Sequence, residues 1–100
     1  MTAAPFKKGD IVMLAKEWRV KGEVFFVRQE QADKEFHGYS RTYKVARKGD
    51  WTIGVNWEDV SERSYHQIRI LNKWQNAKNL VLFENHPDKE MYLHHFGRAS

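Results

Sequence analysis

Short apolar runs separated by turns predict that this chain is mainly β. The clearest run covers residues 51–57, where four large apolar side chains alternate with three small or polar ones, as in a strand that buries one face. Lys-Gly pairs introduce two earlier apolar strands. The predicted strands cover residues 10–15, 23–29, 40–46, 51–57, 64–71 and 79–84.

Two of these strands carry features of a strongly bent sheet. The run Val24-Phe25-Phe26-Val27 is apolar on both faces, which suits a barrel whose outer face is partly covered by another element. Gly54 lies in mid-strand, where glycine usually marks a bend, a bulge or a close backbone approach. Five short strands within residues 8–71 therefore predict a small barrel.

The 100 residues suffice for one domain with a modest core. We expect a flexible lead over residues 1–7, the barrel over 8–71, and an appendage over 72–100 that packs on the barrel. The appendage would contain a strand and a short helix. Val81, Leu82, Phe83, Tyr92 and Phe96 in it exceed what a five-stranded barrel needs to bury. They either pack over the outer face, against Phe25 or Val27, or form a patch for a partner protein or a second copy.

The predicted helix has recognisable ends. Pro87-Asp88-Lys89-Glu90 is typical of a helix start, because proline is tolerated in the first turn and acids there suit the helix dipole. Met91, His95 and Phe96 form a thin apolar stripe before Gly97 ends the helix.

Charge is distributed unevenly along the chain. The net charge is +4, and residues 1–48 hold 11 basic and 6 acidic side chains, against 6 and 7 in residues 49–100. A basic half favours a polyanionic partner, although surplus lysines also serve solubility alone. The chain has no cysteine, which excludes disulfides and zinc ribbons. With no signal-peptide pattern and no membrane-length apolar run, we expect a soluble cytoplasmic protein.

Two sequence patterns resemble a known superfamily. Lys8-Gly9-Asp10-x-Val12 and Lys21-Gly22-x-Val24 resemble the KOW pattern of SH3-like barrels in ribosomal proteins and transcription-elongation factors. Val55-Asn56-Trp57-Glu58-Asp59, followed by Tyr65 and Leu71, is similar to the later strands of Tudor-like barrels. The resemblance covers residues 8–71. It implies a small SH3-like barrel of five or six strands, here with a short C-terminal helix.

A basic stretch with neighbouring rings is the strongest candidate site. Residues 41–48 contain four basic side chains and no acid, and Tyr39, Tyr43 and Trp51 lie close by. Basic groups follow a phosphate backbone, and an exposed ring stacks on a base. In the alternative interpretation, the rings are core and the cations a solvated strand edge.

The first loop offers a second basic and aromatic group. Lys16, Arg19 and Lys21 surround Trp18, which is either an exposed anchor at the barrel rim or a buried cap on the barrel end. The full set of predicted nucleic-acid-binding residues is Lys16, Trp18, Arg19, Lys21, Arg41, Tyr43, Lys44, Arg47 and Lys48.

An aromatic cage is a further candidate. Phe36, Tyr39, Tyr43 and Trp57 could surround a cation such as methyl-lysine, as cages in Tudor-like barrels do. The acids that follow Trp57 would favour a cation there. The alternative is that these rings fill the core.

Catalytic and metal-binding patterns are missing from the sequence. The five histidines have no ligand spacing, no nucleophile motif occurs, and the carboxylates are scattered. We therefore predict a non-catalytic binding module without cofactor or metal, with DNA or RNA as the partner. The alternative is a protein-interaction module, such as a small adaptor or inhibitor of a host or partner protein. The oligomeric state stays open.

Overall fold

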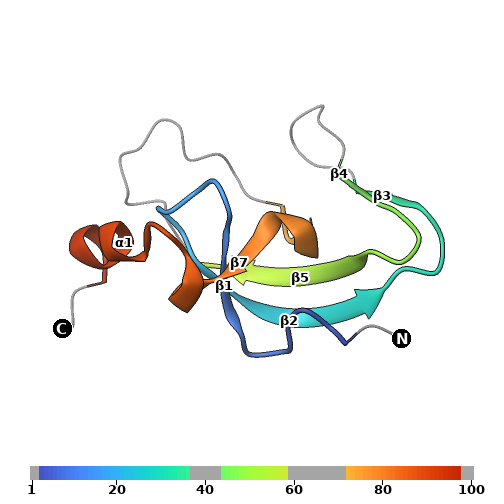
Figure 1. Cartoon of the computed structure of the whole chain (residues 1–100), viewed down its shortest axis with the longest axis horizontal. Helices are drawn as coiled ribbons and strands as arrows, with labels where there is room; N and C mark the ends of the chain where they lie inside the picture. The colour runs from blue at the N-terminus through green and yellow to red at the C-terminus, as the bar shows by residue number, and fades with distance from the viewer. Residues whose placement is uncertain (1–2, 37–43, 59–71, 98–100) are drawn as a thin grey trace.

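The computed structural model describes residues 3–36, 44–58 and 72–97, and these residues are mainly β, as predicted (Figure 1). The strands are β1 (Ile11–Leu14), β2 (Gly22–Gln29), β3 (Lys34–Phe36), β4 (Lys44–Ala46), β5 (Trp51–Trp57), β6 (Trp74–Asn76) and β7 (Leu80–Leu82). The helical elements are the 3₁₀ turns η1 (Ala77–Asn79) and η2 (Phe83–Asn85) and the α-helix α1 (Lys89–His95).

The predicted strands at 10–15, 23–29 and 51–57 correspond to β1, β2 and β5. Only part of the range 79–84 is a strand, because η2 replaces its second half. Of the range 40–46 the structure describes β4, and the range 64–71 lies outside the described residues. The short strands β3 and β6 were missed, so the described strands number seven instead of five or six.

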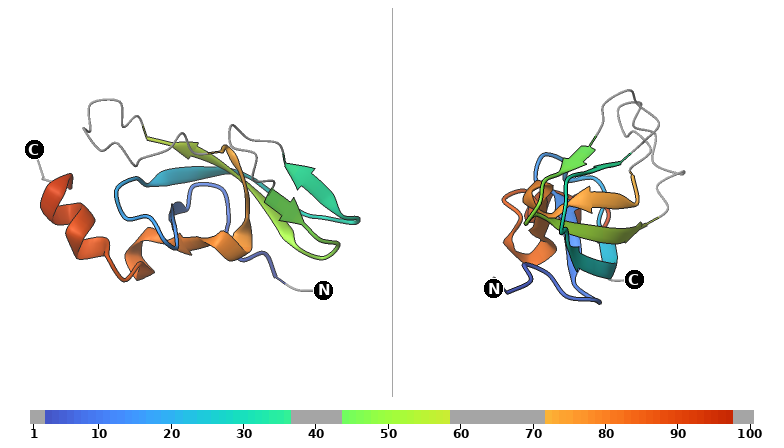
Figure 2. Two further views of the ribbon diagram at one scale, coloured as in Figure 1. Left: turned by 90° about the horizontal axis from the view of Figure 1, so that it is seen from above. Right: turned by 90° about the vertical axis from the view of Figure 1, so that its right-hand side faces the viewer.

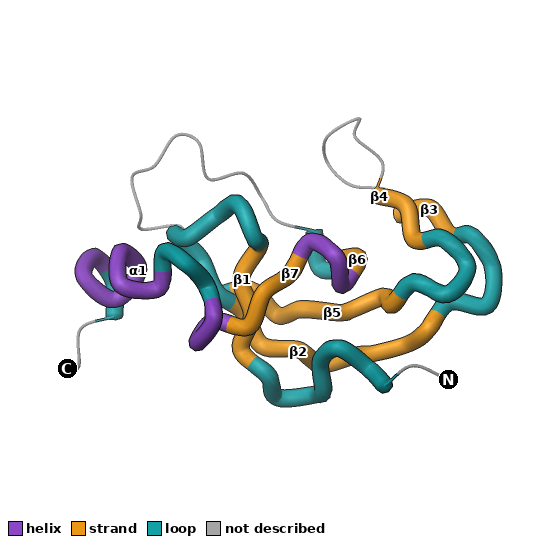
Figure 3. The backbone as a smooth tube through the Cα atoms, in the orientation of Figure 1, coloured by secondary structure: helices purple, strands orange, loops and turns teal. Residues whose placement is uncertain are grey.

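Five strands form one antiparallel sheet in the order β6-β5-β2-β1-β7. The two edge strands, β6 and β7, are joined only by the three residues of η1 (Figure 3). The four residue steps from Asn76 to Leu80 span about 14 Å at most, whereas the edges of a flat five-stranded sheet lie about 19 Å apart. The sheet is therefore curled, and no ladder pairs β6 with β7 among the described residues.

The residues beyond position 71 belong to this same sheet. β6 pairs with β5, and β7 pairs with β1 through Val12–Leu82 and Leu14–Leu80. The segment expected as an appendage thus supplies both edge strands, and only η2 and α1 extend past the sheet.

A bulge in β2 decides which side chains point outward. Val24 pairs with Val55, but Phe26 pairs with Gly54, so the register shifts by one residue at Phe25. A bulge leaves one extra residue unpaired and re-aims the side chains beside it. Val24 is buried in the core, while Phe25 and Phe26 both contact the ring of Trp74 on the other face of the sheet.

The same turn introduces β1 and β5. In Lys7-Lys8-Gly9-Asp10 the Asp10 N–H donates to the Lys7 carbonyl at 3.0 Å, and the Lys7 N–H donates to the Asp10 carboxylate at 3.0 Å. Residues 47–50 repeat both bonds. The two glycines have φ of 94° and 93°, the left-handed conformation that the third position of a type II turn requires.

An arm of two strands extends the β2–β5 ladder. The last pair of the β2–β5 ladder is Gln29 with Trp51. In the arm, Lys34, five residues after Gln29, pairs with Ala46, five residues before Trp51. The arm therefore keeps the register of the ladder. The arm and α1 lie at opposite ends of the molecule (Figure 2).

The core lies inside the curled sheet. Its buried side chains come from β1, β2, β5 and β7 and from the segment before β1: Phe6, Val12, Val24, Ile53, Val55 and Leu80. Trp51 and Trp57, at the two ends of β5, are partly buried and pack against this cluster.

The helix α1 is held to the sheet by Tyr92. This side chain is 2% exposed, and its hydroxyl donates to Glu58, with both carboxylate oxygens at 2.8 Å. Two of the three residues of the predicted stripe are exposed, Met91 at 46% and His95, and only Phe96 is partly buried. The bond to Glu58, just after β5, turns the helix face with Tyr92 and Phe96 toward the sheet. The rings of these two residues lie 5.6 Å apart.

Candidate functional site

Three aromatic rings gather on the outer face of the sheet. The Trp74 ring lies 5.6 Å from that of Phe25 and 5.3 Å from that of Phe26, measured between centroids. Trp74 is 39% exposed, and the two phenylalanines are half-buried. We call these three residues the ring cluster. Contiguous apolar surface that is exposed is typical of binding sites, and Trp74 is the exposed member of this cluster.

Gly54 makes room for the ring cluster. It lies between Phe26 on β2 and Trp74 on β6, its partners in the two ladders, so these side chains share one face of the sheet. A Cβ atom at this position would lie 2.7 Å from the tip of Phe25 and 2.9 Å from both Phe26 and Trp74. The absent side chain lets the rings close over β5.

Two cations border the ring cluster. The Lys73 ammonium lies 5.7 Å from the Phe25 centroid, and the Arg28 guanidinium lies 5.6 Å from the Phe26 centroid, both within cation–π range. Lys73 is exposed, and the Arg28 side chain is 48% exposed. The cluster thus combines stacking surface with two positive groups.

A buried carboxylate fixes the position of Arg28. Glu30 is 6% exposed, accepts three hydrogen bonds of 3.1–3.3 Å from Arg28 and one from the Thr52 hydroxyl. Burial raises the pKa of Glu30, but the hydrogen bonds from Thr52 and Arg28 outweigh burial and hold it below the ordinary value. Glu30 therefore stays ionised and anchors the guanidinium beside Phe26.

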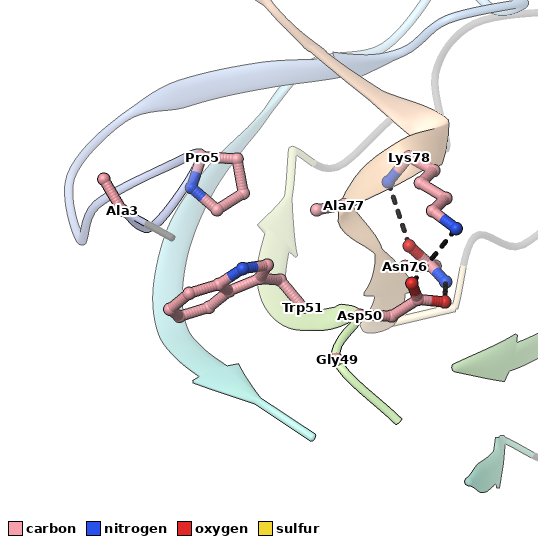
Figure 4. A pocket seen from close by; sticks show the side chains of 8 residues that line it. All are labelled: Ala3, Pro5, Gly49, Asp50, Trp51, Asn76, Ala77 and Lys78. Carbon is pink, nitrogen blue, oxygen red and sulfur yellow. Dashed lines mark hydrogen bonds and ion pairs between the residues drawn. The ribbon is translucent and has the colours of Figure 1, made fainter. Parts of the chain in front are cut away.

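A surface pocket of about 400 Å³ lies where β5 begins and β6 ends (Figure 4). Apolar groups of Ala3, Pro5, Trp51 and Ala77 line one part of it, and Gly49, Asp50, Asn76 and Lys78 line the other. We call it the Trp51 pocket.

Asp50 is the most strongly bound charge in the Trp51 pocket. The Arg47 backbone N–H, the Asn76 amide and the Lys78 ammonium each lie 3.0 Å from its oxygens. These three donors, the Arg47 N–H foremost, lower the pKa of Asp50 to about 2. Asp50 thereby ties the turn before β5 to the end of β6.

We expect Asp50→Asn to have a lower free energy of unfolding than wild type at neutral pH. In acid the two proteins should become equally stable. Because the folded-state pKa lies below the ordinary 3.8, the ionised group stabilises the fold above pH 4, and this contribution disappears between about pH 4 and pH 2. Urea unfolding at pH 7, 5, 4, 3 and 2 measures the difference from wild type. Glu84→Gln, at an exposed carboxylate, is the control. A difference that stays constant with pH would contradict the assignment.

The structure uses most of the first-loop residues internally. Trp18 is half-buried, with its ring 5.9 Å from Phe96 and 5.3 Å from His95, so it covers the helix and is no exposed anchor. Arg19 forms a two-point ion pair with Glu17, at 2.6 and 2.8 Å, and both side chains are under 20% exposed.

The remaining two first-loop cations differ in exposure. The Lys21 ammonium lies 5.0 Å from the Phe83 centroid and 5.1 Å from that of Tyr92, and it helps to hold α1. Lys16 is exposed. Of the four predicted residues in this loop, Lys16 alone presents an exposed charge.

The basic stretch of the arm is only partly described. Arg41 and Tyr43 lie outside the described residues, and Lys44 begins β4, paired with Phe36. Arg47 and Lys48 are exposed. The Arg47 guanidinium pairs with Asp33 at 3.1 Å, and the Lys48 N–H donates to the same carboxylate at 2.9 Å. Asp33 thus offsets part of the positive charge expected here.

The structure does not bring Phe36 and Trp57 together. Phe36 lies in the arm beyond the start of β5, and Trp57 lies at the other end of β5, about 20 Å along the strand. The Trp57 indole N–H donates to the Asn72 carbonyl at 2.8 Å. The other proposed cage residues, Tyr39 and Tyr43, lie outside the described residues.

The sequence pattern alone does not predict the ring cluster. Its one local signal is that Phe25 and Phe26 make their strand apolar on both faces. Trp74 stood alone among polar residues, and only the pairing of β6 with β5 brings it to Gly54.

Within residues 3–36, 44–58 and 72–97, no three or more histidine, aspartate or glutamate side chains are grouped to hold a metal ion. No helix in this part of the chain is long and apolar enough to cross a membrane. No protein-family model matches the chain, and no curated protein or solved structure matches it either.

Proposed function

We propose that this protein is a non-catalytic module that binds single-stranded nucleic acid on the ring cluster. The observation that carries the proposal is the exposed Trp74 ring, packed with Phe25 and Phe26 and bordered by two cations. An aromatic ring can stack only on a base whose face is free, so the ligand is an unpaired strand. Such stacking contributes about 1–3 kcal/mol per base.

Phosphate contacts supply the second part of the binding. Lys73 and Arg28 flank the rings, so a strand stacked on Trp74 places phosphates near both. Two neutralised phosphates on a single strand would give log K a slope of about −1.4 against log salt, and the pairing of Arg28 with Glu30 makes the expected slope shallower than this. Binding is therefore moderately salt-dependent and weakly sequence-specific.

We further propose that the sheet closes into an SH3-like barrel, as the KOW-like and Tudor-like patterns imply. The support is the short link between the edge strands, because η1 joins β6 to β7 in three residues. A closed barrel holds the ring cluster on a rigid wall, so its three rings need no ordering when a ligand binds.

Anisotropy of a labelled ten-nucleotide strand, as DNA and as RNA, tests the function across 25–300 mM salt. We expect Trp74→Ala to weaken binding about 5- to 150-fold, as the loss of one stacked base requires. Lys73→Glu should weaken binding and make the salt slope shallower by about 0.7 or more. Lys16→Glu makes the same charge change at an exposed site in the first loop and should change affinity far less.

If neither the DNA nor the RNA strand binds at 25 mM salt, the proposal is refuted. An affinity that Trp74→Ala leaves unchanged would refute it as well.

The exposed Trp74 ring also favours a second candidate, a protein partner, since tryptophan is enriched among residues that dominate protein interfaces. In that case the oligonucleotides fail to bind, and the partner's affinity falls with Trp74→Ala but scarcely responds to Lys73→Glu.

A further inference from the structure

The Trp51 pocket has hydrogen-bond donors that the fold leaves unused. Among the described residues, nothing accepts a hydrogen bond from the Trp51 indole N–H. Figure 4 shows this nitrogen on the Pro5 side of the ring, facing the pocket. Trp51 is half-buried and its indole nitrogen is accessible, so the N–H can donate to a ligand in place of water.

Among the other polar groups of the pocket, Asp50 is an acceptor that is already in use and Lys78 is a donor with hydrogen atoms to spare. The Asp50 oxygens already accept from Arg47, Asn76 and Lys78. The Lys78 side chain is 74% exposed, and its ammonium contacts Asp50. An ammonium has three N–H donors, so this contact leaves donors for a ligand. The pocket therefore offers donors to the acceptors of a ligand. Because the Asp50 carboxylate offsets part of the Lys78 charge, an anionic group fits only on the solvent side of the Lys78 ammonium, away from Asp50.

The apolar part of the pocket restricts the shape of that ligand. The Trp51 ring offers a flat face, and Pro5 lies across the pocket from it (Figure 4). A planar ring with carbonyl or ring-nitrogen acceptors fits this space, and an attached anion would reach Lys78. A nucleobase with its phosphate has both features.

We propose that the Trp51 pocket is a second subsite that holds one unpaired nucleotide, with its base against Trp51 and its phosphate beside Lys78. This inference rests on the proposed function, because the same strand would supply the base stacked on Trp74. Trp74 pairs with Gly54, which lies three residues along β5 from Trp51, about 10 Å. Trp51 packs on the core face of the sheet and Trp74 on the outer face, so the strand has to pass around the end of β6 to contact both. One strand of several nucleotides, a common site size for such modules, can reach both.

Indole resonances in an ¹H–¹⁵N correlation spectrum test the subsite directly. The four tryptophans give four indole signals, and the one missing in Trp51→Phe belongs to Trp51. We expect this signal to shift when unlabelled (dT)₁₀ is added to the wild-type protein. Lys78→Ala should weaken (dT)₁₀ binding and make its salt slope shallower by about 0.7, the value for one phosphate contact. Lys16→Ala is the matched control and should leave both unchanged.

Trp51→Phe keeps a ring and removes the N–H, so its affinity should fall about 2- to 12-fold, the effect of one hydrogen bond. Urea unfolding of each variant separates this loss from a loss of folding, because Trp51 also packs against the core. If the Trp51 signal and the Lys78→Ala salt slope do not change while Trp74→Ala still weakens binding, the subsite is wrong and the proposed function stands. If wild type binds no strand, both fail.

Discussion

Replacing Ile53 by alanine is expected to lower the free energy of unfolding by about 2–5 kcal/mol. Ile53 is fully buried and sits in the middle of β5, between Val27 on β2 and Gln75 on β6. Alanine leaves a cavity that neighbours on three paired strands cannot easily fill. A domain of this size has about 5–15 kcal/mol in total, so the loss is a large fraction of its stability.

Urea unfolding followed by far-ultraviolet circular dichroism measures the Ile53 effect. Ile53→Val is the matched control, since it removes one methyl group and should cost about 0.5–1.5 kcal/mol. An alanine variant as stable as the valine variant would show that the inside of the sheet can collapse around the gap, and that the core does not centre on β5.

Glu30→Ala is expected to cost about 2–4 kcal/mol, because it leaves two donors without their acceptor. Thr52 is 1% exposed, so water does not reach its hydroxyl to replace the lost bond. The Arg28 guanidinium loses all three of its bonds to the carboxylate but is half-exposed, which lowers its share of the cost. Unfolding in urea at pH 7 gives the value.

Glu30→Gln separates charge from shape in the same network. The amide oxygen can still accept from Thr52 or Arg28, so this variant should lose less stability than Glu30→Ala. Thr52→Val removes the buried hydroxyl, and in its background the cost of Glu30→Ala should shrink. If the two substitutions add without coupling, the hydrogen bond between Thr52 and Glu30 contributes nothing to the fold.

The parts of the fold that follow from the sequence are local. The Lys-Gly-Asp turns before β1 and β5 were predictable, because a positive φ requires glycine and the aspartate bonds back to its own turn. Strand β5 was predictable from alternation alone. The start of the helix followed from Pro87 and the acids after it.

The parts that did not follow depend on pairing across the sheet. Nothing near Trp74 indicates a strand until β5 supplies a partner. The bulge at Phe25 depends on the register of β2 against β5, and it decides that two adjacent phenylalanines share a face. The sequence around Trp18 predicts a loop of cations around a ring, but the helix far along the chain packs against Trp18 and Lys21.

The pairing of β1 with β7 affects how the protein emerges during synthesis. Val12 pairs with Leu82, which is synthesised 70 residues later. At 5–20 residues per second, translation takes about 4–14 s to cover this distance. Until then, one edge of β1 has free backbone groups that can pair with other chains. A nascent chain stalled before residue 80 is therefore prone to aggregate, and rescue should coincide with release of residues 80–82.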